Sequence, residues 1–369
     1  MADPEVLDVP PVEAVETFRG KGYHVGFDWR DTLAGEHARS FTVAKAMRLD
    51  VLQAVRADVD RALAEGTTLA DFRKRLEPRL KELGWWGRQE MVDPATGEVR
   101  MVQLGSPRRL KIIFDTNLRT SYARGRWQRI ERLAEARPWL RYVATLDERT
   151  RPDHMAWHGT VLPVDHPFWR SHYPPNGWLC RCSVVQLSDD DLQEFGYAET
   201  PPPGDWRDAR DWRDSRSGRV WQVPRGIDPG FQFNSGLADR VPGVADQLIS
   251  KMEAAPPDIR RAAIGSPWGT RAFRSHLTGT DAGDWPVAVA GPSAVRLSPA
   301  VAARQAARYP DVEPGDYARV QRIVDDGAVV TRGDHSVAEL EIDGQLWRAT
   351  WKGRAGKVWL TSLRRTRRR

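Results

Sequence analysis

The clearest pattern of apolar positions is a four-residue repeat near the start of the chain. Between residues 36 and 65 it places apolar side chains at Met47, Val51, Val55, Val59 and Leu63. This spacing puts them on one face of an amphipathic helix, and Gly66 is a typical helix end. A second apolar stripe begins after Thr68 and ends at Gly84. The pattern therefore predicts two helices packed as an antiparallel pair.

The period of the pattern then changes along the chain. Residues 1–35 lack a repeat, and Pro10–Pro11 favours an extended lead-in. Residues 88–104 alternate on either side of a glycine-containing turn, which predicts a β-hairpin. Ser106 and Pro107 are an N-cap and a first helical residue, so a long helix is expected up to Pro138. A strand is expected over residues 140–146.

The second half of the chain divides into an arm and a domain. Residues 188–265 are rich in Pro, Trp and Arg, carry Asp-Trp-Arg-Asp at 205–208 and 211–214, and predict an irregular arm laid over a neighbour. Residues 266–363 predict helices that begin near Ser298 and Pro314, followed by about four antiparallel strands. Asp343–Gly344 is a two-residue hairpin turn between two of those strands.

Composition changes this picture in two respects. The chain has 369 residues, a formal net charge of +6 and an arginine-rich end at 364–369. The arginine-rich end and a basic C-terminal domain are suited to binding the phosphates of a nucleic acid. A solvated tail that binds nothing would have the same composition. The N-terminus lacks a secretory pattern, and no run approaches the roughly 20 apolar residues of a membrane span, so we expect no membrane association.

Candidate metal ligands gather between Thr145 and Gln186. This stretch holds both cysteines of the chain and four of its eight histidines. Cys180 and Cys182 are two residues apart, so both thiols point to one side of an extended segment. His154 and His158 are four apart, which is one face of a helix. The set predicts a structural zinc site that closes the loop at 159–179.

Other assignments of the same residues stay open at this stage. His166, His172, Asp147 and Asp153 compete as ligands. The cysteines also suit small core residues, and the histidines suit ordinary loop positions. A catalytic zinc would use Asp147 or Asp165 as a general base. No oxyanion-hole motif surrounds either cysteine, which argues against a nucleophilic role.

These motifs resemble the Mu-type phage head morphogenesis family of minor head proteins. The similarity rests on a helix motif and on four motifs of the ligand-rich stretch, followed by one downstream motif: residues 116–126, Asp147–Thr150, Pro152–His154, Pro174–Trp178, Cys180–Cys182 and Gly226–Phe231. Relatives often carry Cys where Arg151 and His154 stand here, so His158 is chosen as the fourth ligand. The resemblance covers about residues 40–240.

The resemblance implies a minor capsid protein of a Mu-like phage or prophage particle. Such a protein binds portal and major capsid proteins in the host cytoplasm and ends in the virion, in the head or at the portal vertex. A Pro-rich arm with Trp and Arg anchors suits that role.

The last hundred residues resemble barnase–EndoU–RelE-like nuclease domains. The similarity lies in Arg296–Ser298, Tyr309–Val312, Asp316–Tyr317, Trp351–Lys352 and Thr361. Metal-independent RNA cleavage needs proton transfer and cations near the phosphate. Lys352, Arg348, Thr361 and His335 are the candidate catalytic residues, with His276 as a further one. An effector ribonuclease carried with or beside the particle is therefore the alternative function. An inactive domain used for binding would show the same residues.

The sequence as a whole predicts a multidomain α+β protein. The expected order is an extended lead-in, a mostly helical head-morphogenesis core with a β-hairpin and a zinc-stapled loop module, an irregular arm, a helix-plus-antiparallel-sheet domain, and an arginine-rich tail: residues 1–35, 36–187, 188–265, 266–363 and 364–369.

Overall fold

The structure is a computed structural model and describes residues 12–32, 35–240, 255–264, 285–290, 293–354 and 356–366. These residues fall into two compact units. The first comprises the described parts of 1–19, 26–38 and 43–241. The second comprises 20–25, 39–42 and the described parts of 242–369. The protein is a multidomain α+β protein, as the sequence predicts.

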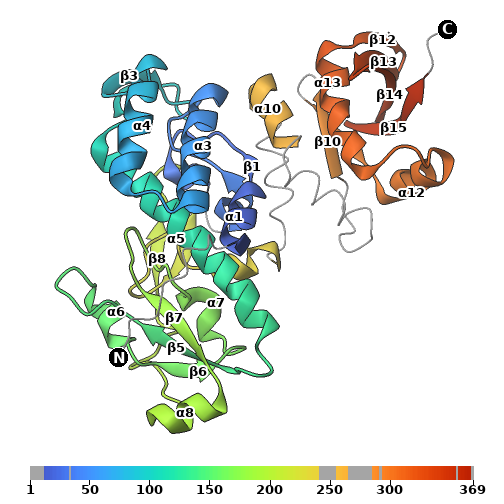
Figure 1. The fold of residues 1–369 in the computed structure, drawn as a ribbon. Coiled ribbons are helices and arrows are strands. Elements are labelled where there is room, and N and C mark those ends of the chain that lie inside the picture. Colours follow the sequence, from blue (N-terminus) through green and yellow to red (C-terminus); the bar gives the residue numbers. More distant parts are fainter. Residues whose placement is uncertain are drawn as a thin grey trace. The chain divides into compact units, whose positions relative to one another are not determined.

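Helices form one part of the first unit (Figure 1). Helix α5 (Pro107–Arg132) packs against α1 (Val12–Arg19), α3 (Leu49–Glu65) and α4 (Leu69–Glu82). Caps visible in the sequence set two of the N-termini: Thr68 accepts from the Asp71 N–H, and Ser106 accepts from the Arg109 N–H. The α3–α4 pair and the long helix are confirmed, and α4 continues through an exposed Pro78.

A small antiparallel sheet forms the other part of this unit. Its strand order is β6–β5–β7, from Val161–Pro163, Trp139–Val143 and Ser183–Leu187. Short helices α6 (Pro152–Ala156) and α7 (Phe168–His172) lie in the connections, and α8 (Asp189–Phe195) follows β7. Buried aromatic side chains fill the core between these elements: Trp127, Tyr142, Trp157, Phe168, Trp169 and Tyr173.

Two β-hairpins complete the first unit. The predicted hairpin is confirmed as β3 (Arg88–Val92) and β4 (Val99–Gln103). A second one, β8 (Ala209–Arg213) with β9 (Val220–Pro224), lies in the segment expected to be irregular. Both turns begin at a buried aspartate, Asp93 and Asp214, whose carbonyl accepts the N–H of a positive-φ glycine. Arg216, from the second turn, forms an ion pair with Asp93 in the first.

The second unit is built on a six-stranded sheet. Its order is β10–β11–β15–β14–β13–β12, from Trp285–Ala290, Ser293–Leu297, Lys357–Thr366, Gln345–Arg354, His335–Ile342 and Ala328–Arg332. All neighbours are antiparallel except β11 and β15. Helices α12 (Pro299–Arg308) and α13 (Arg319–Asp326) contact it, and η3 (Pro314–Ala318) leads into α13.

The remaining described elements of this unit are short. They are α10 (Pro257–Ile264) and a parallel bridge between β1 (Gly22–Tyr23) and β2 (Ser40–Phe41). The predicted antiparallel sheet is confirmed, and it is wider than expected because β10 and β11 extend it. In the described part of the chain, no helix has the length and apolar character needed to cross a membrane.

Several expectations about elements are wrong. The extended lead-in contains α1, whose Phe18 is buried, and η1 (Trp29–Asp31). The helix expected over 36–65 begins only at Leu49, because α2 (Gly35–Arg39) and β2 come first. The arm is largely ordered, and its Trp206, Trp212 and Trp221 pack on the chain's own core. The helix expected at 244–253, His276 and the tail residues 367–369 lie outside the described residues.

Candidate metal centre

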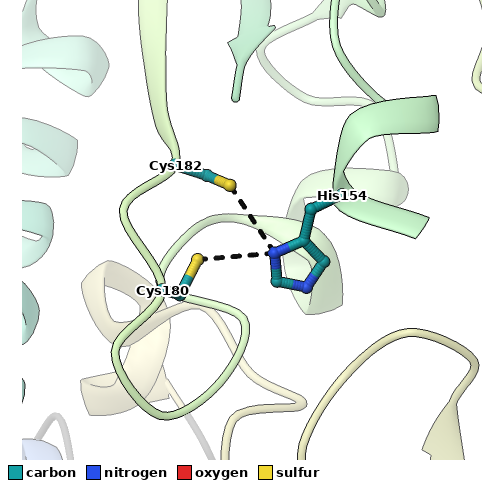
Figure 2. Close-up of side chains that lie close together, drawn as sticks. All are labelled: His154, Cys180 and Cys182. Carbon is teal, nitrogen blue, oxygen red and sulfur yellow. Dashed lines mark hydrogen bonds between the residues drawn. The ribbon is translucent and has the colours of Figure 1, made fainter. Parts of the chain in front are cut away.

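Three of the four predicted ligands meet at one point in the first unit. His154 lies on α6, and Cys180 and Cys182 lie just before β7. His154 Nδ1 is 3.6 Å from each Sγ atom, and both thiols point toward it (Figure 2). The imidazole and Cys180 are buried, and Cys182 is half-buried. The extended segment therefore turns both thiols to one side, as its spacing predicts.

The far side of the His154 ring fixes which nitrogen faces the thiols. Nε2 lies 3.0 Å from the carbonyl oxygen of Gly226, so it is the nitrogen that carries hydrogen and donates. The ring also stacks on Trp157, with centroids 5.1 Å apart. Nδ1 is left facing the two sulfurs. A histidine that donates one N–H to a carbonyl and offers the other nitrogen is typical of metal ligands.

Hydrogen bonds around the two sulfurs favour the thiolate form. The backbone N–H of Asn176 donates to Cys180, and that of Thr145 donates to Cys182. The pKa of Cys180 is lowered to about 4, first because Cys182 donates a hydrogen bond to it. The pKa of Cys182 is raised because the two thiols then share one proton. The two cysteine side chains thus carry one negative charge, and His154 Nδ1 faces it.

Tyr142 adds a buried hydroxyl to the same site. Asn176 Nδ2 donates to its oxygen over 3.0 Å, and the hydroxyl interacts with Cys182. Because that oxygen already accepts from Asn176, its own hydrogen is available to the sulfur. Burial, followed by the two neighbouring thiols, raises the pKa of Tyr142, so the hydroxyl stays protonated.

A downstream segment holds the cysteine loop in place. Asp228 Oδ2 accepts from Arg151 Nη2 at 2.7 Å and from the Trp178 N–H at 2.9 Å. The Asp228 N–H donates to the Asn176 carbonyl. Gly177 leaves room for this carboxylate, because a Cβ there would lie 2.3 Å from Asp228 Oδ2. The segment that supplies the Gly226 carbonyl is therefore fixed to the loop that carries the cysteines.

The fourth predicted ligand is not part of this cluster. The helix ends at Ala156, so His158 falls in the following turn, where its Nδ1 accepts the Ala144 N–H. Its alternatives are engaged elsewhere. Asp147 is ion-paired with Arg181, His166 Nδ1 accepts the Phe168 N–H, and His172 stacks on Phe168. Among the described residues, the group that could hold a metal ion consists of His154, Cys180 and Cys182.

The three donors fit zinc in type and in spacing. Zinc bonds of about 2.0–2.1 Å to nitrogen and 2.3 Å to sulfur, at a tetrahedral angle, place the two atoms about 3.6 Å apart. The Nδ1–Sγ distances have this value. Two sulfurs and one imidazole are also the ligand types that zinc favours over harder cations. These three residues would hold the ion, and a fourth donor would complete the tetrahedron.

The candidate catalytic residues of the second unit are only partly brought together. His335 and Lys352 are cross-strand partners, and Asp334 contacts both, at 2.7 and 3.2 Å. Arg348 is ion-paired with Glu339 further along β14. Thr361 lies at a bulge in β15, where its hydroxyl donates to the Thr350 carbonyl. The structure thus assembles two of the four residues.

Comparison with known proteins finds a family that is similar to part of the chain. The family described as Phage Mu protein F like protein matches over residues 53–185. All three members of the cluster lie within the matched residues, whereas Gly226 and Asp228 lie beyond their end. No solved structure matches the chain.

Two curated proteins are similar to about half of the chain. The Putative capsid assembly protein F of Escherichia phage Mu is 50% identical over 188 residues, which cover 51% of this chain and 43% of that protein. The Mu-like prophage FluMu F protein of Haemophilus influenzae is 42% identical over 182 residues, 49% of this chain and 43% of that protein. The chain spans less than half the length of these relatives.

Proposed function

We propose that this chain is a head assembly protein of a Mu-like phage or prophage particle. One observation carries the proposal: half of the chain is 50% identical to a protein described as a putative capsid assembly protein. The family match over residues 53–185 contains α4, α5 and the three residues of the candidate metal centre. Its partners are the portal and major capsid proteins, which it meets in the host cytoplasm during assembly and accompanies into the virion.

Complementation tests this role. A particle-forming strain that lacks the coding sequence is expected to produce few DNA-filled heads, as counted by electron microscopy. Expression of the full chain in trans is expected to restore them, and the chain is expected to be detected by mass spectrometry in purified particles. Normal numbers of filled heads without the chain would overturn the proposal.

We further propose that His154, Cys180 and Cys182 hold a structural zinc ion. The Nδ1–Sγ spacing, the orientation of the imidazole and the N–H groups directed at both sulfurs support it. Protein purified without chelator is expected to contain about one zinc per chain. Cobalt substitution is expected to give the absorption of a site with two thiolates.

The control for zinc separates this cluster from the other histidines. Cys182→Ser is expected to lose the metal, whereas His158→Ala, outside the cluster, is expected to keep it. Retention of zinc by Cys182→Ser at the level of the unaltered chain would place the ion elsewhere.

A ribonuclease is the second candidate function, and one observation favours it. Asp334 contacts both His335 and Lys352, which groups a proton-transfer residue with a cation that would stabilise a charged phosphorane. Incubation of the full chain with RNA tests it. Cleavage that His335→Ala abolishes and Lys357→Ala retains would support the enzyme. If the RNA stays intact, the ribonuclease proposal is wrong and head assembly remains the proposed function.

A further inference from the structure

A continuous row of side chains crosses five strands of the sheet in the second unit. The register pairs Arg296 on β11 with Trp359 on β15, and Trp359 with Lys352 on β14. It then pairs Lys352 with His335 on β13, and His335 with Arg332 on β12. At about 4.8 Å between strands, these five residues extend over about 19 Å.

The row lies on the face of the sheet opposite the helices. Residues alternate between faces along a strand, and the neighbours Trp351 and Leu360 are buried in the core beneath α13. Lys352 and Trp359 therefore face away from that core. The side chains of Lys352 and His335 are 38% and 51% exposed, and Trp359 is half-buried. The row is accessible to a ligand.

The composition of the row differs from that of an ordinary solvated face. It has three cationic side chains with a tryptophan between two of them, and Asp334 contacts Lys352 and His335. A second cross-strand pair on the same face is Arg348 opposite Arg364, and Arg348 is ion-paired with Glu339 on the neighbouring strand.

We propose that the row Arg296–Trp359–Lys352–His335–Arg332 binds single-stranded nucleic acid. Cations along a line contact successive phosphates, and an aromatic side chain among them stacks on an unpaired base. A duplex keeps its bases stacked on each other, so it cannot use Trp359 in this way. The proposal goes beyond the assembly role and does not require cleavage, because binding needs none of the proton transfers of a nuclease.

Fluorescence anisotropy with the full chain tests the row. The probes are labelled single strands of DNA and of 2′-O-methyl RNA, with the DNA duplex as comparison. The modified RNA lacks the 2′-hydroxyl nucleophile, so cleavage cannot obscure binding. The two single strands offer the same phosphates and similar base faces but differ in their sugars. A difference in affinity between them therefore shows which sugar the row prefers. Titrations at several salt concentrations give the slope of log K against log salt.

The variants separate the row from general positive charge. Arg332→Ala/Lys352→Ala removes two cations from the row, and Arg88→Ala/Arg210→Ala removes two exposed arginines from hairpin strands of the first unit. The first pair is expected to reduce the salt slope by about 1.4, at about 0.7 per phosphate contact. The second is expected to leave the slope unchanged. Trp359→Ala is expected to weaken binding by about 5- to 100-fold.

Trp359→Phe keeps an aromatic ring and is expected to retain most of the affinity, which separates stacking from a folding defect. Circular dichroism confirms that each variant is folded. The proposal is overturned if the two double variants bind equally, if Trp359→Phe binds as weakly as Trp359→Ala, or if the duplex binds as tightly as both single strands. A failure here leaves head assembly and the zinc site unaffected.

Discussion

At the scale of single residues, the candidate metal centre depends on a glycine outside the set of proposed ligands. Gly226 has φ +78°, and its carbonyl orients His154. A Cβ at this position would lie 2.6 Å from Asp153 Cβ and 2.8 Å from Trp157 Cη2. Both contacts are with the helix turn that carries His154. Glycine is therefore needed twice, for the left-handed backbone and for the close approach.

Replacement of this glycine is expected to loosen the site. Gly226→Ala should lower the free energy of unfolding by about 3 kcal/mol, from backbone strain and from the clash. Gly204→Ala is the matched control, because φ is +73° there and nothing lies near the added Cβ, so it should cost about 1 kcal/mol. Urea unfolding measures both. Equal losses would show that the contact with α6 contributes nothing.

The sequence identifies the ligands better than their surroundings. The spacing of Cys180 and Cys182 predicts that the thiols share a side, and His154 belongs to a matched motif. The orienting groups carry no local signal, because Tyr142 and Gly226 reach the site only through sheet pairing and a loop that returns later in the chain. Helical spacing points to His158, but α6 ends at Ala156 and the side chain of His158 lies outside the cluster.

At the scale of elements, two hairpins far apart in sequence are joined by one buried ion pair. Arg216 is mostly buried, Asp93 is fully buried, and Arg216 also lies 3.2 Å from Asp31. The hydrogen bond from Arg216, followed by one from the Ala95 N–H, holds the pKa of Asp93 below its usual range. Removal of Asp93 leaves the mostly buried Arg216 with Asp31 as its remaining carboxylate partner, so hydrogen bonds to a buried charge are lost.

This pair predicts a dependence of stability on pH. Because the pKa of Asp93 is lowered by folding, its contribution is present above the unfolded value of about 3.9 and is lost as the pH falls through the folded value. Asp93→Asn is expected to cost about 2 kcal/mol at pH 7, because Arg216 keeps Asp31 as a partner, and clearly less near pH 2. Urea unfolding at the two pH values checks this, with Glu98→Gln as the exposed control. An equal cost at both values would contradict it.

Local signals account for the elements that were predicted correctly. The caps at Thr68 and Ser106 mark α4 and α5, and the turn at Asp343–Gly344 separates β13 from β14. The β8–β9 hairpin was missed because its Trp and Arg residues suggest an exposed arm. Its apolar side chains are buried only against a core built by other parts of the chain. Tertiary packing, rather than local propensity, decides such segments.

At the scale of the whole molecule, the chain has two units with separate cores. One core surrounds Tyr142 and Trp157, and the other surrounds Val320, Trp347 and Leu360. The metal centre belongs to the first unit and the basic row to the second. Ligands of the two sites are therefore expected to stabilise different parts of the protein.

Calorimetry of the full chain is expected to show this division as two unfolding transitions. Removal of metal with a chelator should lower the midpoint of one transition and leave the other in place, because a bound ion stabilises only the unit that holds it. Cys182→Ser is the control and should show no response to the chelator. A shift of both transitions by the same amount would contradict independent units.

The position of Gly226 in the chain also has a consequence for synthesis on the ribosome. The last ligand, Cys182, is made 44 residues before the carbonyl that orients His154. At about 5–20 residues per second, the nascent chain passes through a stage of a few seconds in which the three metal ligands exist without that carbonyl. The proposed zinc ion would thus meet its three ligands before the Gly226 carbonyl fixes the imidazole.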